Sequence, residues 1–108
     1  MPRAHTPISA ADIATLTAWA LSTDGRSLAR SIDFADFQEA FAFMTRVALR
    51  AEQIDHHPDW HNVWRRVDIR LSTHDANGLT HLDLELARFI DRIAPPASPV
   101  SPTPPREP

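Results

Sequence analysis

Residues 66–73 contain the pattern that most restricts the fold of this chain. Val67, Ile69 and Leu71 alternate with charged or polar side chains. Because successive side chains of a strand point to opposite faces, this alternation predicts a strand with one buried face and one face open to water. Such half-buried strands are typical of antiparallel sheets, whereas the strands of parallel sheets are apolar throughout. A sheet that is covered on one face only is therefore expected.

Three further strands are expected in the same sheet. They are residues 17–22, residues 27–34 and a short strand around residues 60–64. The first two flank the sequence Thr23-Asp24-Gly25-Arg26, and an Asp-Gly pair between two strands is typical of a hairpin turn. Trp60 and Trp64 have the even spacing that would place both on one face of the third strand. Packing in the core or at an interface is the expected role for at least one of them, and a wall against a flat ligand is the alternative.

Three helices are expected to cover this sheet. The first begins at Ser9 and directs Ile8, Ile13 and Leu16 toward the core. The third begins at Thr80, and Asp83 three positions later completes a sequence typical of a capping box. Its predicted core side chains are Leu82, Leu86, Phe89 and Ile93.

The second helix, residues 35–55, is the longest, and it is apolar on more than one side. One stripe consists of Phe37, Phe41, Met44, Ala48 and Ala51, and beside it lie Phe43, Val47 and Ile54. A helix that is apolar over more than one face is expected to pack on its own domain and also on a partner subunit.

The order α-β-β-α-β-β-α predicts an α+β fold, in which helices cover one face of a four-stranded antiparallel sheet. At 108 residues, the chain is expected to form one domain, residues 6–94. Seven prolines fall within residues 95–108, which therefore cannot form a helix or a central strand. This tail is expected to be disordered, and a role as a proline-rich ligand is the alternative.

The composition excludes several classes of function. The net charge is −3, so direct binding to nucleic acid or to an anionic membrane is not expected. The absence of cysteine removes disulfides, thiolate catalysis and cysteine-based zinc sites. Neither a signal peptide nor an apolar segment of about 20 residues is visible, so a cytoplasmic protein is expected.

Histidines near residue 56 are the candidates for chemistry. Glu52 and His56 are four residues apart, which places them on one face of a helix end and makes His56 a candidate proton donor. A simple ion pair is the alternative. His57 precedes Pro58, which biases His57 out of the helix and turns its side chain away from that of His56. His74 follows the alternating strand, where catalytic side chains often lie, although it could also be an ordinary polar loop residue.

A metal site is not expected here. His57 and His61 have a spacing that could bind metal on a helix, but Pro58 prevents that helix from continuing between them. The sequence also lacks the His-Glu-x-x-His arrangement. His5, His61 and His81 are therefore expected to be incidental.

These residues resemble the pterin-4a-carbinolamine dehydratase family. Its motif is Glu-x3-His-His-Pro-x5-aromatic-x9-His-x8-Asp. The matching positions here are Glu52, His56, His57, Pro58, Trp64, His74 and Asp83. The resemblance covers residues of about 8 to 93. Trp64 departs from the tyrosine that is frequent in the family, and this change does not affect the three histidines.

The resemblance implies a metal-free enzyme without a cofactor, which dehydrates the 4a-hydroxytetrahydrobiopterin released by aromatic amino acid hydroxylases to quinonoid dihydropterin. It implies acid/base roles for His56 and His74, pterin binding by His57 and orientation of His56 by Glu52. The resemblance also implies that Asp55, Ser72, Thr73 and Asp75 line the pterin pocket, while Asp83 is expected to cap the third helix.

The family further implies a homodimer or homotetramer through the helix 35–55. Animal relatives also serve as dimerisation partners of a homeodomain transcription factor. A protein-binding module is therefore the alternative to an enzyme.

Overall fold

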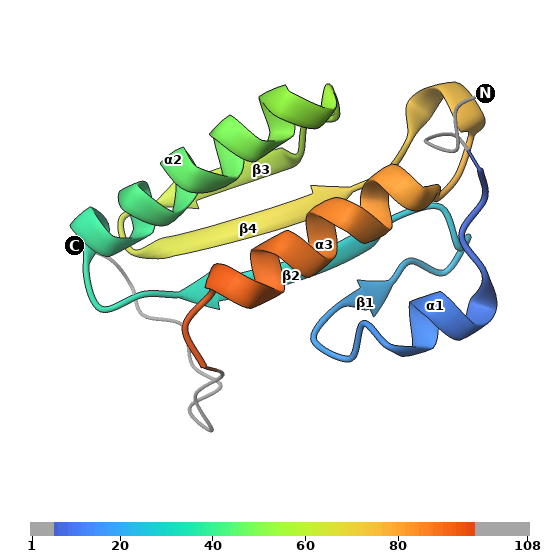
Figure 1. The fold of residues 1–108 in the computed structure, drawn as a ribbon. Helices are drawn as coiled ribbons and strands as arrows, with labels where there is room; N and C mark the ends of the chain where they lie inside the picture. Colours follow the sequence, from blue (N-terminus) through green and yellow to red (C-terminus); the bar gives the residue numbers. More distant parts are fainter. Residues whose placement is uncertain (1–5, 97–108) are drawn as a thin grey trace.

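A computed structural model of the chain describes residues 6–96, and it contains three α-helices, four strands and one short 3-10 helix (Figure 1). In chain order these are α1 (Ala10–Ala14), β1 (Ala20–Leu21), β2 (Leu28–Asp33), α2 (Phe37–Ile54), β3 (Asp59–Val63), β4 (Arg66–Leu71), η2 (His74–Ala76) and α3 (His81–Ile93). The expected order α-β-β-α-β-β-α is confirmed. The predicted tail begins at Pro95, and residues 97–108 lie outside the described part, so their disorder stays a prediction.

The four strands form one antiparallel sheet in the order β1-β2-β4-β3. The alternating segment is β4, and it lies between β2 and β3 with Leu28 opposite Leu71 and Ile32 opposite Val67. The first predicted strand is much shorter than expected, because residues 17–19 form a turn that buries Trp19. Only two residues of β1 therefore pair with β2.

The third strand ends one residue earlier than predicted. Trp64 has a φ of 52°, in the left-handed region, and it belongs to the turn between β3 and β4. Trp60 is half-buried within β3, whereas Trp64 is exposed. The prediction that both rings share one face of a strand is therefore wrong, because the turn takes Trp64 out of the sheet.

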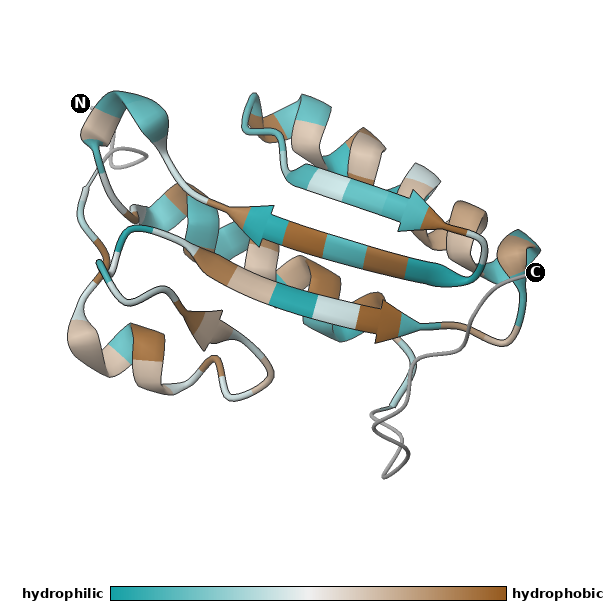
Figure 2. Cartoon of the chain, turned by 180° about the vertical axis from the view of Figure 1, so that it is seen from behind, coloured by the Kyte–Doolittle hydropathy of each residue, from teal (hydrophilic) through white to brown (hydrophobic). Residues whose placement is uncertain are grey.

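Helices α2 and α3 lie side by side on one face of the sheet, and the opposite face is open (Figure 1). Seen from that open side, β4 alternates between hydrophobic and hydrophilic residues (Figure 2). Val67, Ile69 and Leu71 are buried under the helices, while the polar residues between them are not. The half-buried sheet that the alternation predicts is confirmed.

Helix α2 buries one of its two apolar sides. Its buried side chains are Ala40, Phe43, Val47 and Ala51. Phe37 and Phe41 stay 46% and 55% exposed, although both belong to the longer apolar stripe of the sequence. The helix begins after Asp36, whose carboxylate accepts a hydrogen bond from the backbone N–H of Glu39.

Helix α3 begins with the predicted capping box. The Thr80 side chain accepts a hydrogen bond from the backbone N–H of Asp83, and the Asp83 carboxylate accepts one from the backbone N–H of Thr80. The predicted core face is incomplete: Leu86 is buried, and Phe89 and Ile93 pack against the core, but further core residues were not predicted. Besides Asp83, the buried side chains of α3 are Leu84, Leu86, Ala87 and Ile90. Leu82, Phe89 and Ile93 are only half-buried. The capping box directs the Asp83 side chain into the domain, and Leu84, Leu86, Ala87 and Ile90 lie on the same buried side of the helix.

The N-terminal segment is joined to α3 by a partly buried polar contact. Trp19 Nε1 donates a hydrogen bond to Asp91 Oδ1 over 2.8 Å, and the Arg30 guanidinium donates to the same oxygen. This carboxylate therefore connects the segment after α1, strand β2 and helix α3.

Candidate active site

Helix α2 ends in a turn that separates the two neighbouring histidines. Asp55 has a φ of 55°, and its N–H bonds to the carbonyl of Glu52. The N–H of His56 bonds to the carbonyl of Ala51, which completes a Schellman turn. Consequently His56 turns into the domain and is buried, whereas His57 stays exposed. The left-handed residue Asp55 therefore ends the helix, before Pro58 could do so.

His56 is paired with Asp83, and not with Glu52 as predicted. His56 Nε2 lies 2.6 Å from Asp83 Oδ1, and Asp83 is completely buried. Asp83 Oδ2 accepts hydrogen bonds from the Thr80 N–H over 3.0 Å and from the Thr73 hydroxyl over 2.7 Å. The Thr80 hydroxyl in turn lies 2.8 Å from that of Thr73. Asp83 thus caps α3, as expected, and also holds an imidazole.

Glu52 contacts the other histidine. Glu52 Oε1 lies 2.9 Å from His57 Nε2, and both side chains are exposed. The turn at Asp55 removes His56 from the helix face on which a spacing of four residues would have placed it beside Glu52. An exposed pair of this kind contributes little to stability.

His74 reaches the site from the end of β4. Thr73 and Gly78 form an isolated bridge, which closes a loop that contains η2. Within this loop Asn77 adopts a left-handed conformation with a φ of 57°. His74 is the first residue of η2 and is exposed, whereas Thr73 beside it is buried.

The ends of α2 and β4 enclose a cleft of about 520 Å³. Its lining residues are Ile54, Asp55, His56, His57, Ser72, Thr73, His74, Asp75 and Leu82. All seven predicted pterin-binding residues are in this set, and Glu52 is outside it. A cleft of this size is typical of a small-molecule site.

Two apolar lining residues and one polar partner were missed as site residues. Ile54 and Leu82 are the apolar side chains in the lining of the cleft. Asp83 was expected to cap α3 in preference to a catalytic role. Its position in the family motif was the signal for a further role.

Within residues 6–96, the side chains of His, Asp and Glu form no group of three that could hold a metal ion. Over the same part of the chain, no helix has both the length and the apolar character needed to cross a membrane.

Comparison with known proteins places the chain in a family. The family described as pterin 4 alpha carbinolamine dehydratase matches residues 5–93. The chain belongs to the pterin-4a-carbinolamine dehydratase family. The predicted resemblance is therefore confirmed, and the chain is an enzyme of the hydro-lyase class to which this family belongs.

Two curated relatives are named after the same dehydratase. The relative from Burkholderia multivorans is 55% identical over 86 residues, which is 80% of this chain and 84% of the relative. The relative from Mesorhizobium japonicum is 60% identical over 78 residues, which is 72% of this chain and 80% of the relative.

A solved structure supports the same dehydratase fold. The crystal structure of a transcriptional coactivator/pterin dehydratase from Brucella melitensis aligns with a TM-score of 0.77 at 38% identity. The alignment covers 83% of this chain and all of that chain.

Proposed function

We propose that this protein dehydrates 4a-hydroxytetrahydrobiopterin to quinonoid dihydropterin and water by histidine acid/base catalysis. One observation carries the proposal: His56, His57 and His74 line one cleft, and a buried carboxylate holds His56. Family membership supplies the reaction class, and these side chains supply groups that can move protons near neutral pH.

The reaction requires two proton transfers. One proton is delivered to the hydroxyl on C4a, so that the C4a–O bond breaks and water leaves while the N5 lone pair forms the C=N bond. A second proton is then removed from N5, which yields the neutral quinonoid product. General acid and general base catalysis each contribute about 10²- to 10⁴-fold to such a rate.

We assign the base to His56. An ionised carboxylate only accepts hydrogen bonds, so neutral His56 carries its proton on Nε2, facing Asp83. Its Nδ1 then has the free lone pair, and it makes no hydrogen bond to another group within residues 6–96. Asp83 also stabilises the imidazolium that forms when Nδ1 takes the N5 proton, as the carboxylate does in a catalytic triad.

We assign the acid to His74 and the orientation of the pterin to His57. His74 lies across the cleft from the end of α2 and is accessible to a leaving hydroxyl. Glu52 holds His57 Nε2, so Glu52 acts on pterin orientation and not on the base. Asp55, Ser72, Thr73 and Asp75 complete the walls around the ring.

A stopped-flow absorbance assay tests this proposal. The protein at micromolar concentration is expected to accelerate the loss of water from 4a-hydroxytetrahydrobiopterin. A rate equal to that of buffer alone would reject the dehydratase function. We also propose that neither a metal nor a cofactor takes part, so the activity is expected to survive exhaustive dialysis against a chelator. Loss of activity that zinc restores would contradict the metal-free mechanism.

We further propose that the enzyme works in the cytoplasm, in recycling of tetrahydrobiopterin for an aromatic amino acid hydroxylase. Its product is the oxidised quinonoid pterin, which must be reduced before a hydroxylase can use it again. We propose a homodimer or homotetramer that forms through α2. The exposed side chains of Phe37, Phe41 and Leu49 support this assembly.

The second candidate function is a protein-binding module. It is supported by the same exposed side of α2 and by the coactivator name of the Brucella melitensis protein. The three histidines in one cleft favour the enzyme, because packing of α2 on a partner does not require them. A protein that binds partners through α2 and shows no dehydratase activity would favour this second candidate.

A further inference from the structure

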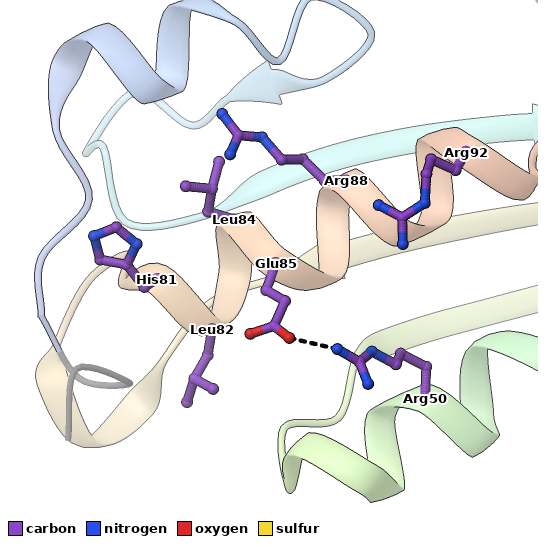
Figure 3. Close-up of a pocket in the computed structure, with 7 residues that line it drawn as sticks. All are labelled: Arg50, His81, Leu82, Leu84, Glu85, Arg88 and Arg92. Carbon is purple, nitrogen blue, oxygen red and sulfur yellow. Dashed lines mark hydrogen bonds and ion pairs between the residues drawn. The ribbon is translucent and has the colours of Figure 1, made fainter.

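A second cleft of about 510 Å³ lies between α2 and α3, next to the histidine cleft (Figure 3). Its lining residues are Arg50, His81, Leu82, Leu84, Glu85, Arg88 and Arg92. Leu82 lines both clefts, so the two meet at this side chain. None of the residues in the second cleft, apart from Leu82, belongs to the catalytic site proposed above.

The second cleft is positively charged, although the chain as a whole carries a charge of −3. The cleft is lined by three arginines, Arg50, Arg88 and Arg92, and by one carboxylate, that of Glu85. Arg50 pairs with Glu85, whereas Arg88 points toward Asp12 of α1. In Figure 3, Leu82 and Glu85 project from α3 toward α2, and Arg50 projects from α2 to meet Glu85. A cleft with this balance favours an anionic ligand, because a guanidinium matches the geometry of a carboxylate or a phosphate.

The arginines can accept a ligand without loss of strong internal contacts. Arg50 Nη2 pairs with Glu85 Oε2, and both side chains are substantially exposed. Arg88 is 3.9 Å from Asp12 and also exposed. Arg92 forms no ion pair within residues 6–96, and its guanidinium lies 5.5 Å from the ring of Phe89. Exposed pairs contribute little to stability, so an anion can compete with Glu85 for Arg50.

Leu82 lines both clefts, so a substituent of a pterin in the histidine cleft can extend past this side chain into the second cleft. In the proposed reaction His56 removes the proton from N5, and the substituent of a tetrahydropterin is attached to C6, the next ring atom. Asp83 holds His56, and Leu82 precedes Asp83. We therefore infer that the C6 substituent passes Leu82, where the two clefts meet. Arg50 precedes Ile54 by one helical turn, which is about 6 Å along the axis of α2.

We propose that the second cleft binds the end of an anionic C6 substituent, so that the enzyme prefers tetrahydropterins whose side chain carries a carboxylate or a phosphate. This inference rests on the proposed dehydratase function and adds a class of substrate to it. Arg50 and Arg92 bind the anion, Arg88 adds positive charge at the far end, and Glu85 weakens binding by competition.

The test compares ligands that differ in the charge of the substituent. Dissociation constants are measured by titration calorimetry at low salt for 7,8-dihydrobiopterin, which is neutral there, and for 7,8-dihydrofolate, which ends in carboxylates. Dihydroneopterin and its phosphate form a second, shorter pair that separates a phosphate from a carboxylate. We expect each anionic ligand to bind about tenfold more tightly than its neutral partner, and this preference to fall as salt is added.

Variants with opposite effects make the test specific. Arg50→Gln combined with Arg92→Gln is expected to weaken dihydrofolate binding about tenfold and to leave dihydrobiopterin binding within about twofold. Glu85→Gln is expected to strengthen dihydrofolate binding about threefold. Arg26→Gln, in the distant hairpin turn, removes one positive charge far from the cleft and is expected to change the binding of neither ligand.

Two negative results have different meanings. If the protein dehydrates and binds the neutral pterin but shows no preference for the anionic ligand, or if the double variant weakens both ligands equally, the second-cleft inference is wrong. If the protein neither binds nor dehydrates any pterin, the proposed function is wrong and this inference fails with it.

Discussion

At the scale of single residues, Asp83 connects the capping of a helix with the chemistry of the cleft. One of its oxygens accepts hydrogen bonds from Thr80 and Thr73, and the other holds His56. A completely buried carboxylate requires such partners, because an unpaired buried charge is very costly. The geometry that starts α3 therefore also determines which nitrogen of His56 faces a ligand.

Asp83→Asn is expected to lower kcat about 10²- to 10⁴-fold with little change in KM. The amide oxygen can still accept the bonds from Thr80 and Thr73, so its NH₂ group faces His56 Nε2. The proton of His56 then moves to Nδ1, where the base is needed. Stopped-flow kinetics measures the rate, and ¹⁵N NMR of the ring reports the tautomer.

Glu52→Gln is the matched control, because it removes a carboxylate from the exposed His57 instead. We expect kcat to change by less than about fivefold in this variant, since the pair is solvated. Equal losses in the two variants, with no change of tautomer in Asp83→Asn, would contradict the assignment of Asp83 to His56.

At the scale of elements, the buried stripe of each helix is determined by contacts with the sheet. Helix α2 has two apolar sides, and the side with Ala40, Phe43, Val47 and Ala51 is buried. Phe43 on this side packs in the core, while Phe37 and Phe41 stay exposed on the other side. In α3 the inward carboxylate of Asp83 sets the rotation, and Leu84 and Ile90 become core residues.

Ile90→Ala is expected to reduce the free energy of unfolding by about 2–5 kcal/mol, because Ile90 is completely buried and its loss leaves a cavity. Denaturant unfolding followed by circular dichroism measures this change. Leu21→Ala is the matched control: Leu21 is 46% exposed, and its truncation is expected to cost less than about 1 kcal/mol. If the two variants lose similar amounts of unfolding free energy, Ile90 is not a core residue of α3.

The hairpin turn between β1 and β2 is expected to depend on pH. The Ser22 hydroxyl and the backbone N–H of Arg26 donate hydrogen bonds to Asp24 Oδ1, and they hold the pKa of Asp24 below its ordinary value of 3.8. Because the pKa is lowered in the folded state, the stabilisation is present above about pH 4 and is lost as the pH falls through the lowered pKa.

Asp24→Ala is expected to lower Tm at neutral pH, and the difference from the unmodified protein is expected to narrow below about pH 4. Thermal unfolding at a series of pH values measures it. A difference in Tm that stays constant down to pH 2 would show that ionisation of Asp24 does not stabilise the turn.

At the scale of the whole molecule, a single chain leaves a large apolar surface uncovered. Phe37, Phe41 and Leu49 are exposed on α2, and Leu49 reaches 63%. Exposed apolar patches of this kind are typical of surfaces that bind another protein. The subunit interface proposed for α2 would cover these side chains.

Phe37→Glu combined with Phe41→Glu is expected to convert the oligomer to monomers, because two carboxylates would be buried without partners in the interface. Sedimentation velocity measures the mass, and circular dichroism checks that the helix content is retained. Leu21→Glu, on the exposed edge strand β1, is the control and is expected to leave the assembly unchanged. A monomeric unmodified protein would contradict the interface itself.

The sequence alone was sufficient for features that depend on neighbouring residues. The alternation of residues 66–71 predicts a half-buried strand, Thr80 and Asp83 predict the start of α3, and the family motif contains the three histidines that line the cleft. Each of these depends on periodicity or on a short spacing, which the chain carries directly.

The tertiary structure decided which residue contacts which. A spacing of four suggested Glu52 as the partner of His56, but the left-handed Asp55 takes His56 off the helix face and leaves Glu52 beside His57. The partner of His56 is Asp83, 27 residues later. No local sequence pattern predicts this contact. It forms because α3 packs beside the end of α2 on the same face of the sheet (Figure 1).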